Sequence, residues 1–157
     1  MHPTSNDLPK KTRAAMCDLL NARLADAIDL RLQTKQAHWN VKGPHFIALH
    51  ELFDKLYDVV GEYVDELAER AVQLGGTAKG TLQAVAKHTS LYAYPIAASD
   101  GRDHLKALSR ALAHFGKSVR HAIEAAAKAG DADTADLYTE ISRENDKQLW
   151  FIEAHLE

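Results

Sequence analysis

The sequence predicts an all-α fold, a four-helix bundle with a short extra helix in the long connection between its second and third long helices. Two observations carry this prediction. Apolar residues recur three and four positions apart over long stretches, as they do on amphipathic helices. The sustained alternation that marks strands is absent. At 157 residues the chain is long enough for one domain with a sizeable core.

The first long helix is expected to start at Arg13 and to run to about Asn40. Residues 1–12 contain two prolines and mostly polar side chains, so we expect them to form a flexible N-terminal tail. The bundle domain then covers residues 13–157. Gly43-Pro44 ends the first helix, because this dipeptide breaks helices.

The second helix is expected from about Pro44 to Leu74, where Gly75-Gly76 gives a C-terminal signal. Residues 77–99 are less regular, although TLQAVAKHT within them could form a short helix. Ser99-Asp100 suits the start of the third long helix, which Gly130 closes. The fourth helix begins over residues 131–134 and completes the bundle.

Composition excludes several classes of protein. The formal net charge is −3, so the chain as a whole lacks the basic character of a nucleic-acid-binding protein. The single cysteine, Cys17, permits no internal disulfide, and its place on a helical stripe favours a packing role. No apolar run approaches the roughly 20 residues of a membrane span, and residues 1–13 lack a signal-peptide core. We therefore expect a soluble cytoplasmic protein.

The second helix has three faces when each residue is turned by about 100°. One face is apolar and is expected in the core: Leu49, Leu52, Phe53, Leu56, Val60, Tyr63, Leu67, Ala71 and Leu74. Another is charged and expected in solvent: Glu51, Lys55, Asp58, Glu62, Glu66 and Gln73. A third stripe is neither: His50, Asp54, Tyr57, Gly61, Asp65 and Ala68, with Glu69 at its edge.

The third stripe has the chemistry of a metal site. His50 and Asp54 are four residues apart, as are Asp65 and Glu69, so the side chains of each pair meet on the helix surface. Imidazole and carboxylate ligands suit first-row metals such as Fe(II), Mn(II) or Zn(II). No cysteine pair accompanies them, which argues against a structural zinc site. The alternative is a partly exposed helix flank with incidental polar residues.

The two halves of the stripe are too far apart to share a metal within one chain. Asp54 and Asp65 are eleven residues apart, which is roughly 16 Å along a helix. Either two weak sites exist, or an antiparallel two-fold dimer brings the halves together, with its axis near Val60 and Gly61. Gly61 lacks a side chain and would permit close approach there. The turn after the first helix brings His38 toward His50.

These residues resemble two signatures of the Dps family, the mini-ferritins. The first is His38-Trp39-Asn40-Val41-Lys42-Gly43, followed by Leu49-His50 and, after three residues, Asp54. The second is Val64-Asp65-Glu66-Leu67-Ala68-Glu69-Arg70, followed by Leu74-Gly75 and Ala78. The helix plan is similar to the family's over nearly the whole chain.

The resemblance implies a ferritin-like bundle and a hollow dodecamer with ferroxidase centres at its two-fold interfaces. Carried over by position, His38, His50 and Asp54 would join Asp65 and Glu69 of the partner subunit around a dinuclear Fe(II)/Fe(III) site. Trp39 would lie beside the centre, intercepting radicals or packing the interface. Family members usually oxidise Fe(II) with hydrogen peroxide rather than dioxygen and store Fe(III) oxide, which protects against oxidative damage. Zn or Mn could compete for the same ligands.

Iron would also need an entry route. Four acidic residues cluster at the start of the fourth helix: Asp131, Asp133, Asp136 and Glu140. In the family this region lines three-fold pores, where an acidic ring would concentrate cations. The alternative is local, because acidic residues at a helix N-terminus are favourable by themselves.

DNA is the second expected partner, and it leads to an alternative function, a nucleoid-associated DNA-compacting protein with secondary iron chemistry. Family members that bind DNA often carry a flexible lysine-rich tail. Here the tail offers Lys10, Lys11 and Arg13 against Asp7, so it favours the alternative only weakly. A third hypothesis is a structural helical oligomer with a degenerate site. The intact two-part ligand set argues against it. The oxidant, the role of each ligand and the route of iron stay open.

Overall fold

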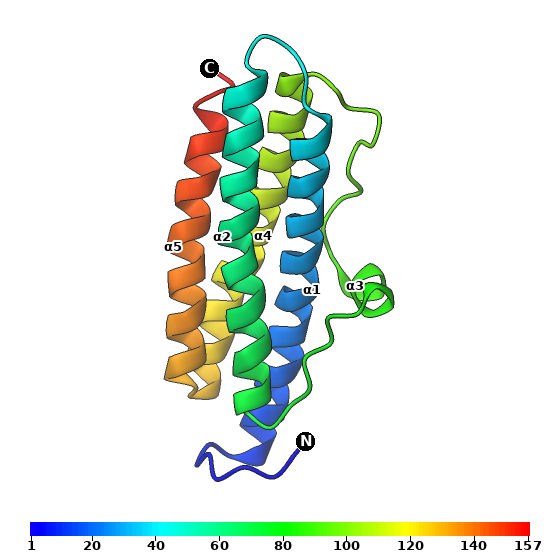
Figure 1. The fold of residues 1–157 in the computed structure, drawn as a ribbon. Coiled ribbons are helices and arrows are strands. Elements are labelled where there is room, and N and C mark those ends of the chain that lie inside the picture. Colours follow the sequence, from blue (N-terminus) through cyan, green and yellow to red (C-terminus); the bar gives the residue numbers. More distant parts are fainter.

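A computed structural model describes residues 1–157 and contains five α-helices and no strand. The helices are α1 (Lys10–Asn40), α2 (Phe46–Gln73), α3 (Leu82–His88), α4 (Gly101–Ala129) and α5 (Ala132–Glu153). Figure 1 shows the four long helices side by side, with short α3 outside the bundle against α1. The predicted fold class is therefore confirmed, including the extra helix in the long connection.

The helix ends follow local chemistry. α1 begins at Lys10, three residues earlier than the sequence predicts, because Pro9 sets a suitable φ of −53° and Arg13 Nε donates to the Leu8 carbonyl oxygen. The carboxylate of Asp100 caps α4 by accepting from the backbone N–H of Arg102 at 2.8 Å. Gly130, with a φ of +80°, ends α4 in a left-handed conformation that suits glycine.

The core lies along the inner stripes of the four long helices. The predicted inner residues of α2 are buried, except for Leu52, which packs partly exposed against the core. Cys17 is also buried, and its Sγ–H donates to the carbonyl oxygen of Ala71. Burial of such apolar side chains contributes most of the stability of a bundle of this kind.

The long connection runs along α1 and carries the chain from one end of the bundle to the other (Figure 1). Asp26, which is fully buried, fixes it by accepting from the backbone N–H and hydroxyl of Ser90 at 2.6 and 3.0 Å. At the far end, the Lys42 N–H donates to the Ser99 carbonyl oxygen. The α1–α2 turn and the start of α4 therefore share one end of the bundle. No helix is both long and apolar enough to cross a bilayer.

Candidate metal centre

The α1–α2 turn brings two of the predicted ligands into contact. Gly43 adopts a φ of +110°, which reverses the chain within a few residues. As a result His38 on α1 and His50 on α2 stack, with ring centroids 3.7 Å apart and planes 23° from parallel. His38 is buried and His50 half-buried, so both rings are held by their surroundings.

The two histidines also share a reciprocal pair of hydrogen bonds. Nδ1 of His38 lies 2.8 Å from the His50 carbonyl oxygen, and Nδ1 of His50 lies 2.8 Å from the His38 carbonyl oxygen. A carbonyl oxygen only accepts, so both Nδ1 atoms carry the proton. Nε2 is then the nitrogen of each ring left for a metal, with the second nitrogen anchored as in metal-binding histidines.

Asp54 lies beside this histidine pair. One carboxylate oxygen is 3.7 Å from His38 Nδ1, and the same oxygen accepts from the ammonium group of Lys35. The Lys35 hydrogen bond holds the pKa of Asp54 below its ordinary value, and the nearby His38 lowers this pKa further. Asp54 is therefore ionised at neutral pH. Lys35 is absent from the predicted site, although its position three residues before His38 places it on the same helix face.

Asp65 and Glu69, the other predicted carboxylates, extend from α2 into solvent. Neither forms an ion pair within the chain. No three His, Cys, Asp or Glu side chains of this chain lie together in a way that could hold a metal ion. The structure thus brings His38, His50 and Asp54 together and leaves Asp65 and Glu69 apart from them. The complete ligand set stays a prediction that needs a second chain.

The segment of α2 between the two halves is covered in part by α1. The guanidinium carbon of Arg31 lies 4.2 Å from the ring centroid of Tyr57. Arg31 also fills the space beside Gly61, where an added Cβ would lie 3.0 Å from Nη2. Within the chain, Gly61 therefore makes room for this arginine. Trp39 is 67% exposed at the end of α1.

The four predicted pore residues have different environments. Asp131 is buried, caps α5 through the N–H and hydroxyl of Thr134, and forms an ion pair with Arg70 at 2.8 Å. Asp133, Asp136 and Glu140 are exposed. The structure gives Asp131 a capping role. Asp133 lies 3.9 Å from Arg70 Nη2, whereas Asp136 and Glu140 have no ion-pair partner in the chain.

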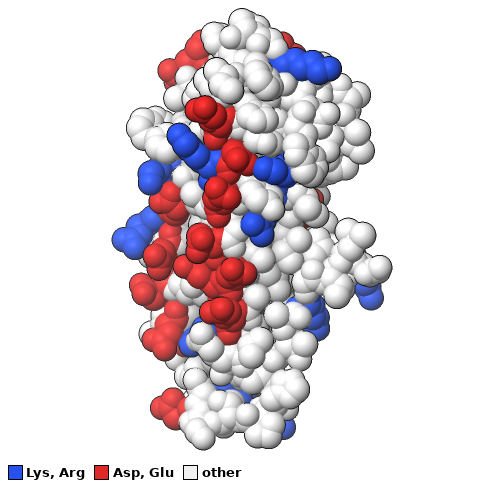
Figure 2. Space-filling model, viewed as in Figure 1, with Lys and Arg blue, Asp and Glu red and all other residues white.

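Glutamates also line a groove between α2 and α5, on the acidic face shown in Figure 2. The groove has a volume of about 590 Å³, and its lining includes Glu62, Glu66, Glu140 and Glu144. Burial, together with the charges of Glu140 and Glu62, raises the pKa of Glu66. This groove holds none of the five predicted metal ligands.

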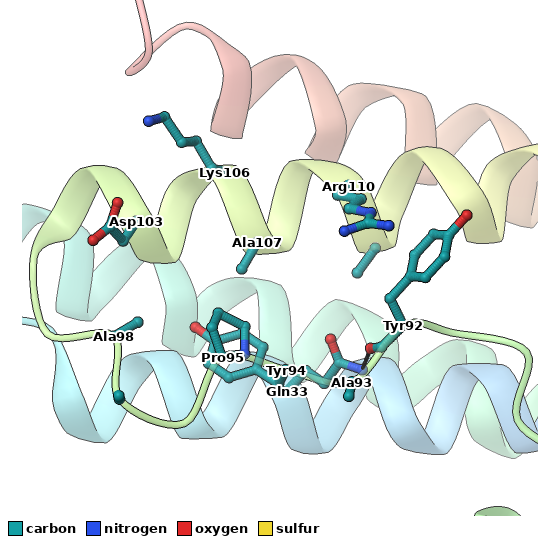
Figure 3. Close-up of a pocket in the computed structure, with 12 residues that line it drawn as sticks. Gln33, Tyr92, Ala93, Tyr94, Pro95, Ala98, Asp103, Lys106, Ala107 and Arg110 are labelled. Atoms are coloured by element: carbon teal, nitrogen blue, oxygen red, sulfur yellow. Dashed lines mark hydrogen bonds between the residues drawn. The ribbon is translucent and has the colours of Figure 1, made fainter.

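A pocket of about 540 Å³ lies between the long connection and α4 (Figure 3). Arg110 lies over the ring of Tyr92, with its guanidinium carbon 3.6 Å from the centroid. Beside the pocket, the Tyr94 hydroxyl is 2.6 Å from Nδ1 of buried His104. Burial lowers the pKa of His104, so this ring stays neutral and structural. The pocket contains none of the predicted ligands.

Comparison with known proteins identifies the family of this chain. A model of the ferritin-like domain matches residues 17–157. The DNA protection during starvation protein of Agrobacterium fabrum is 49% identical over 156 residues, covering 99% of this chain and 96% of that protein. Its counterpart from Mycolicibacterium smegmatis is 37% identical over 152 residues, covering 96% and 81%.

Solved structures agree with these relatives. The tetragonal form of Mycobacterium smegmatis Dps superposes with a TM-score of 0.94 at 35% identity, covering 100% of this chain and 94% of that chain. The Dps protein of Vibrio cholerae O1 superposes with a TM-score of 0.93 at 26% identity, covering 100% and 98%. The latter is described as a member of a broad superfamily of ferritin-like diiron-carboxylate proteins.

Proposed function

The chain belongs to the Dps family of ferritin-like proteins, and from this premise we propose that it is an iron-sequestering ferroxidase. In this proposal twelve copies form a hollow shell. Centres between two-fold-related subunits oxidise Fe(II) with hydrogen peroxide or dioxygen, and the shell stores Fe(III) oxide. The cell is thereby protected from peroxide and free iron together.

The observation that carries the proposal is the mutual anchoring of the histidine pair. Both rings have Nδ1 bound to a carbonyl oxygen, so Nε2 is the nitrogen of each ring left for a metal. An ionised carboxylate, Asp54, lies beside them. Two nitrogen donors and one oxygen donor form half of a site for borderline metals such as Fe(II). Asp65 and Glu69 of the partner subunit would supply the remaining oxygen donors.

The chemistry requires two iron ions for each peroxide. Two Fe(II) ions give up one electron each, and one hydrogen peroxide accepts both electrons with two protons to form two waters. Paired delivery of the electrons avoids release of hydroxyl radical. In this scheme iron is the substrate, and the protein binds it and keeps two ions close together.

Binding of Fe(II) must compete with Lys35. Its ammonium group hydrogen-bonds the Asp54 oxygen that faces His38. A divalent ion in this position would displace the ammonium, since both cations use the same carboxylate. Lys35 therefore neutralises Asp54 while no iron is bound. Asp133, Asp136 and Glu140 are the exposed carboxylates that we assign to iron entry.

The test is Fe(II) oxidation by metal-free protein, with peroxide under nitrogen and with dioxygen separately. Size-exclusion chromatography with simultaneous detection of protein and iron follows. We expect rapid oxidation and co-elution of iron with a dodecamer-sized particle. Asp54→Ala and Glu69→Ala should lose the rapid phase of Fe(II) oxidation. Glu124→Ala, which changes an exposed residue of α4, should keep it. Unchanged kinetics in both site variants would refute the assignment.

We propose DNA binding as a second function because one face of α4 is basic. Five exposed basic side chains on this face have no ion-pair partner in the chain, against the two acidic residues Asp103 and Glu124: Arg102, Lys106, Arg110, Lys117 and Lys128. They rise about 6 Å for every four residues, so they could follow a phosphate backbone. A gel shift at low and moderate salt tests this. Loss of binding in Lys106→Glu/Arg110→Glu would support it, and unchanged binding would contradict it.

A further inference from the structure

Arg31 has an unusual position on the face that carries the predicted metal ligands. Its guanidinium group lies over the ring of Tyr57 and against the backbone of Gly61. Lys35, one turn along α1, also lies over Tyr57, with Nζ 4.8 Å from the ring centroid. The ring and the missing side chain at position 61 together hold the guanidinium group in one place.

Arg31 nevertheless lacks an anionic partner in its own chain. Its Nε is buried and has no hydrogen-bond acceptor. None of the ion pairs of the chain involves it, whereas Lys35 pairs with Asp54. Removing a charged group from water is unfavourable unless an opposite charge compensates. A stacked aromatic ring compensates only in part. The half-exposed guanidinium group is thus available to an anion of another molecule.

Exposed apolar residues of α2, on the same face as Gly61, indicate which molecule supplies the anion. Ile47 is 62% exposed near the start of α2, and Val72 is 56% exposed near its end. If two copies of α2 pack antiparallel so that Asp54 meets Asp65 and His50 meets Glu69, the axis passes between positions 59 and 60. The same axis places Ile47 against Val72 of the partner subunit. This apolar match does not depend on any metal ligand, and it favours a second copy of the chain.

The antiparallel register of the two α2 helices also identifies the anion that would pair with Arg31. Position 61 lies opposite position 58 across this axis, so the Arg31 that covers Gly61 faces Asp58 of the partner subunit. Asp58 is exposed and has no ion-pair partner in its own chain. We propose that Arg31 and Asp58 of the partner subunit form an ion pair across the two-fold axis, twice in each dimer. The inference rests on the two-fold arrangement of the proposed function.

This ion pair reduces the electrostatic repulsion between the two subunits at the interface. The third stripe of α2 carries Asp54, Asp65 and Glu69, and Asp58 lies beside it at the edge of the charged face. Two such faces repel each other when they pack together. Lys35 neutralises Asp54 within each chain, and Arg31 neutralises Asp58 between chains. Arg31 is thus a positioning residue, because it aligns the two helices whose ends carry the metal ligands.

Charge reversal tests the pair. Arg31→Glu, Asp58→Arg and the double variant are compared with the wild-type protein by sedimentation velocity over a dilution series. Metal-free protein is used in chelator, so that iron cannot bridge the subunits. We expect each single reversal to raise the concentration of half-dissociation at least about tenfold, because it places like charges at a desolvated contact. The double variant should recover most of this loss. Lys87→Glu, at an exposed position on α3, is the control.

The outcomes separate this inference from the function on which it rests. A wild-type protein that is monomeric would overturn the two-fold arrangement before any variant is made. A wild-type oligomer that is unaffected by either reversal would overturn only the ion pair. Dissociation that the double variant does not restore would overturn the partnership with Asp58. If Arg31→Glu loses its circular dichroism, Arg31→Gln replaces it, in a double-mutant cycle with Asp58→Asn.

Discussion

His38 and His50 hold each other in place, since the Nδ1 atom of each ring donates to the backbone carbonyl oxygen of the other at 2.8 Å. The arrangement is symmetric, although the residues come from different helices and are separated by a turn. Each residue anchors the other's ring and so fixes the tautomer that can bind metal. The α1–α2 turn is therefore part of the candidate centre.

The first prediction follows from this mutual anchoring. Replacing His50 with Ala should remove one ligand and also release the His38 ring, because His38 keeps its backbone acceptor but loses the stacked ring. We expect affinity for Co(II), used as a stable substitute for Fe(II), to fall by more than the 10- to 100-fold typical of losing an outer partner. Isothermal titration calorimetry measures this. An affinity within twofold of wild type would contradict the assignment.

The second prediction concerns Lys35. Lys35→Met keeps the apolar stem but frees the Asp54 carboxylate, so metal affinity at neutral pH should rise. Lys35 lowers the pKa of Asp54, so in the variant this pKa should move up toward the ordinary carboxyl value. As the solution is acidified, the Co(II) affinity of Lys35→Met should therefore begin to fall from its plateau at a higher pH than that of the wild type. If Co(II) affinity depends on pH in the same way in both proteins below neutral pH, this role of Lys35 is contradicted.

The third prediction separates the acidic residues at the start of α5. Asp131→Ala should lower the free energy of unfolding by about 3 to 5 kcal/mol, because it removes the buried partner of Arg70 and the cap of α5. Asp136→Asn should leave this free energy unchanged and slow iron uptake. Urea denaturation and stopped-flow uptake distinguish the two residues. Equal stability loss in both variants would contradict the capping role of Asp131.

The fourth prediction concerns metal competition. Zn(II) accepts the same nitrogen and oxygen donors and undergoes no redox change. Prior addition of two Zn(II) per predicted centre should therefore suppress the rapid phase of Fe(II) oxidation, and a chelator should restore it. Oxidation at the full rate in zinc-loaded protein would place the reaction elsewhere on the molecule.

The helices could be predicted from the sequence, because their signals are local. Apolar periodicity marks their length, Asp100 marks the start of α4 and Gly130 marks its end. The sequence was also sufficient to bring His38, His50 and Asp54 together, since one short turn joins their helices. It could not reveal the partner of Asp131, because Arg70 is 61 residues away in the chain. It also missed Lys35 and Arg31, because their roles depend on how α1 rotates against α2. A helix pattern gives the face of a residue but not its contact on the neighbouring helix.

The central claim is that each metal centre is built by two chains, and complementation between variants tests it most directly. Asp54→Ala disables one half of the ligand set and Glu69→Ala the other. Each homo-oligomer should lack rapid Fe(II) oxidation. When equal amounts of the two are dissociated and reassembled together, about a quarter of the centres should combine two intact halves, and the rapid phase should return to that extent. No recovery in a correctly assembled mixture would show that the centre lies within one chain and would contradict the account.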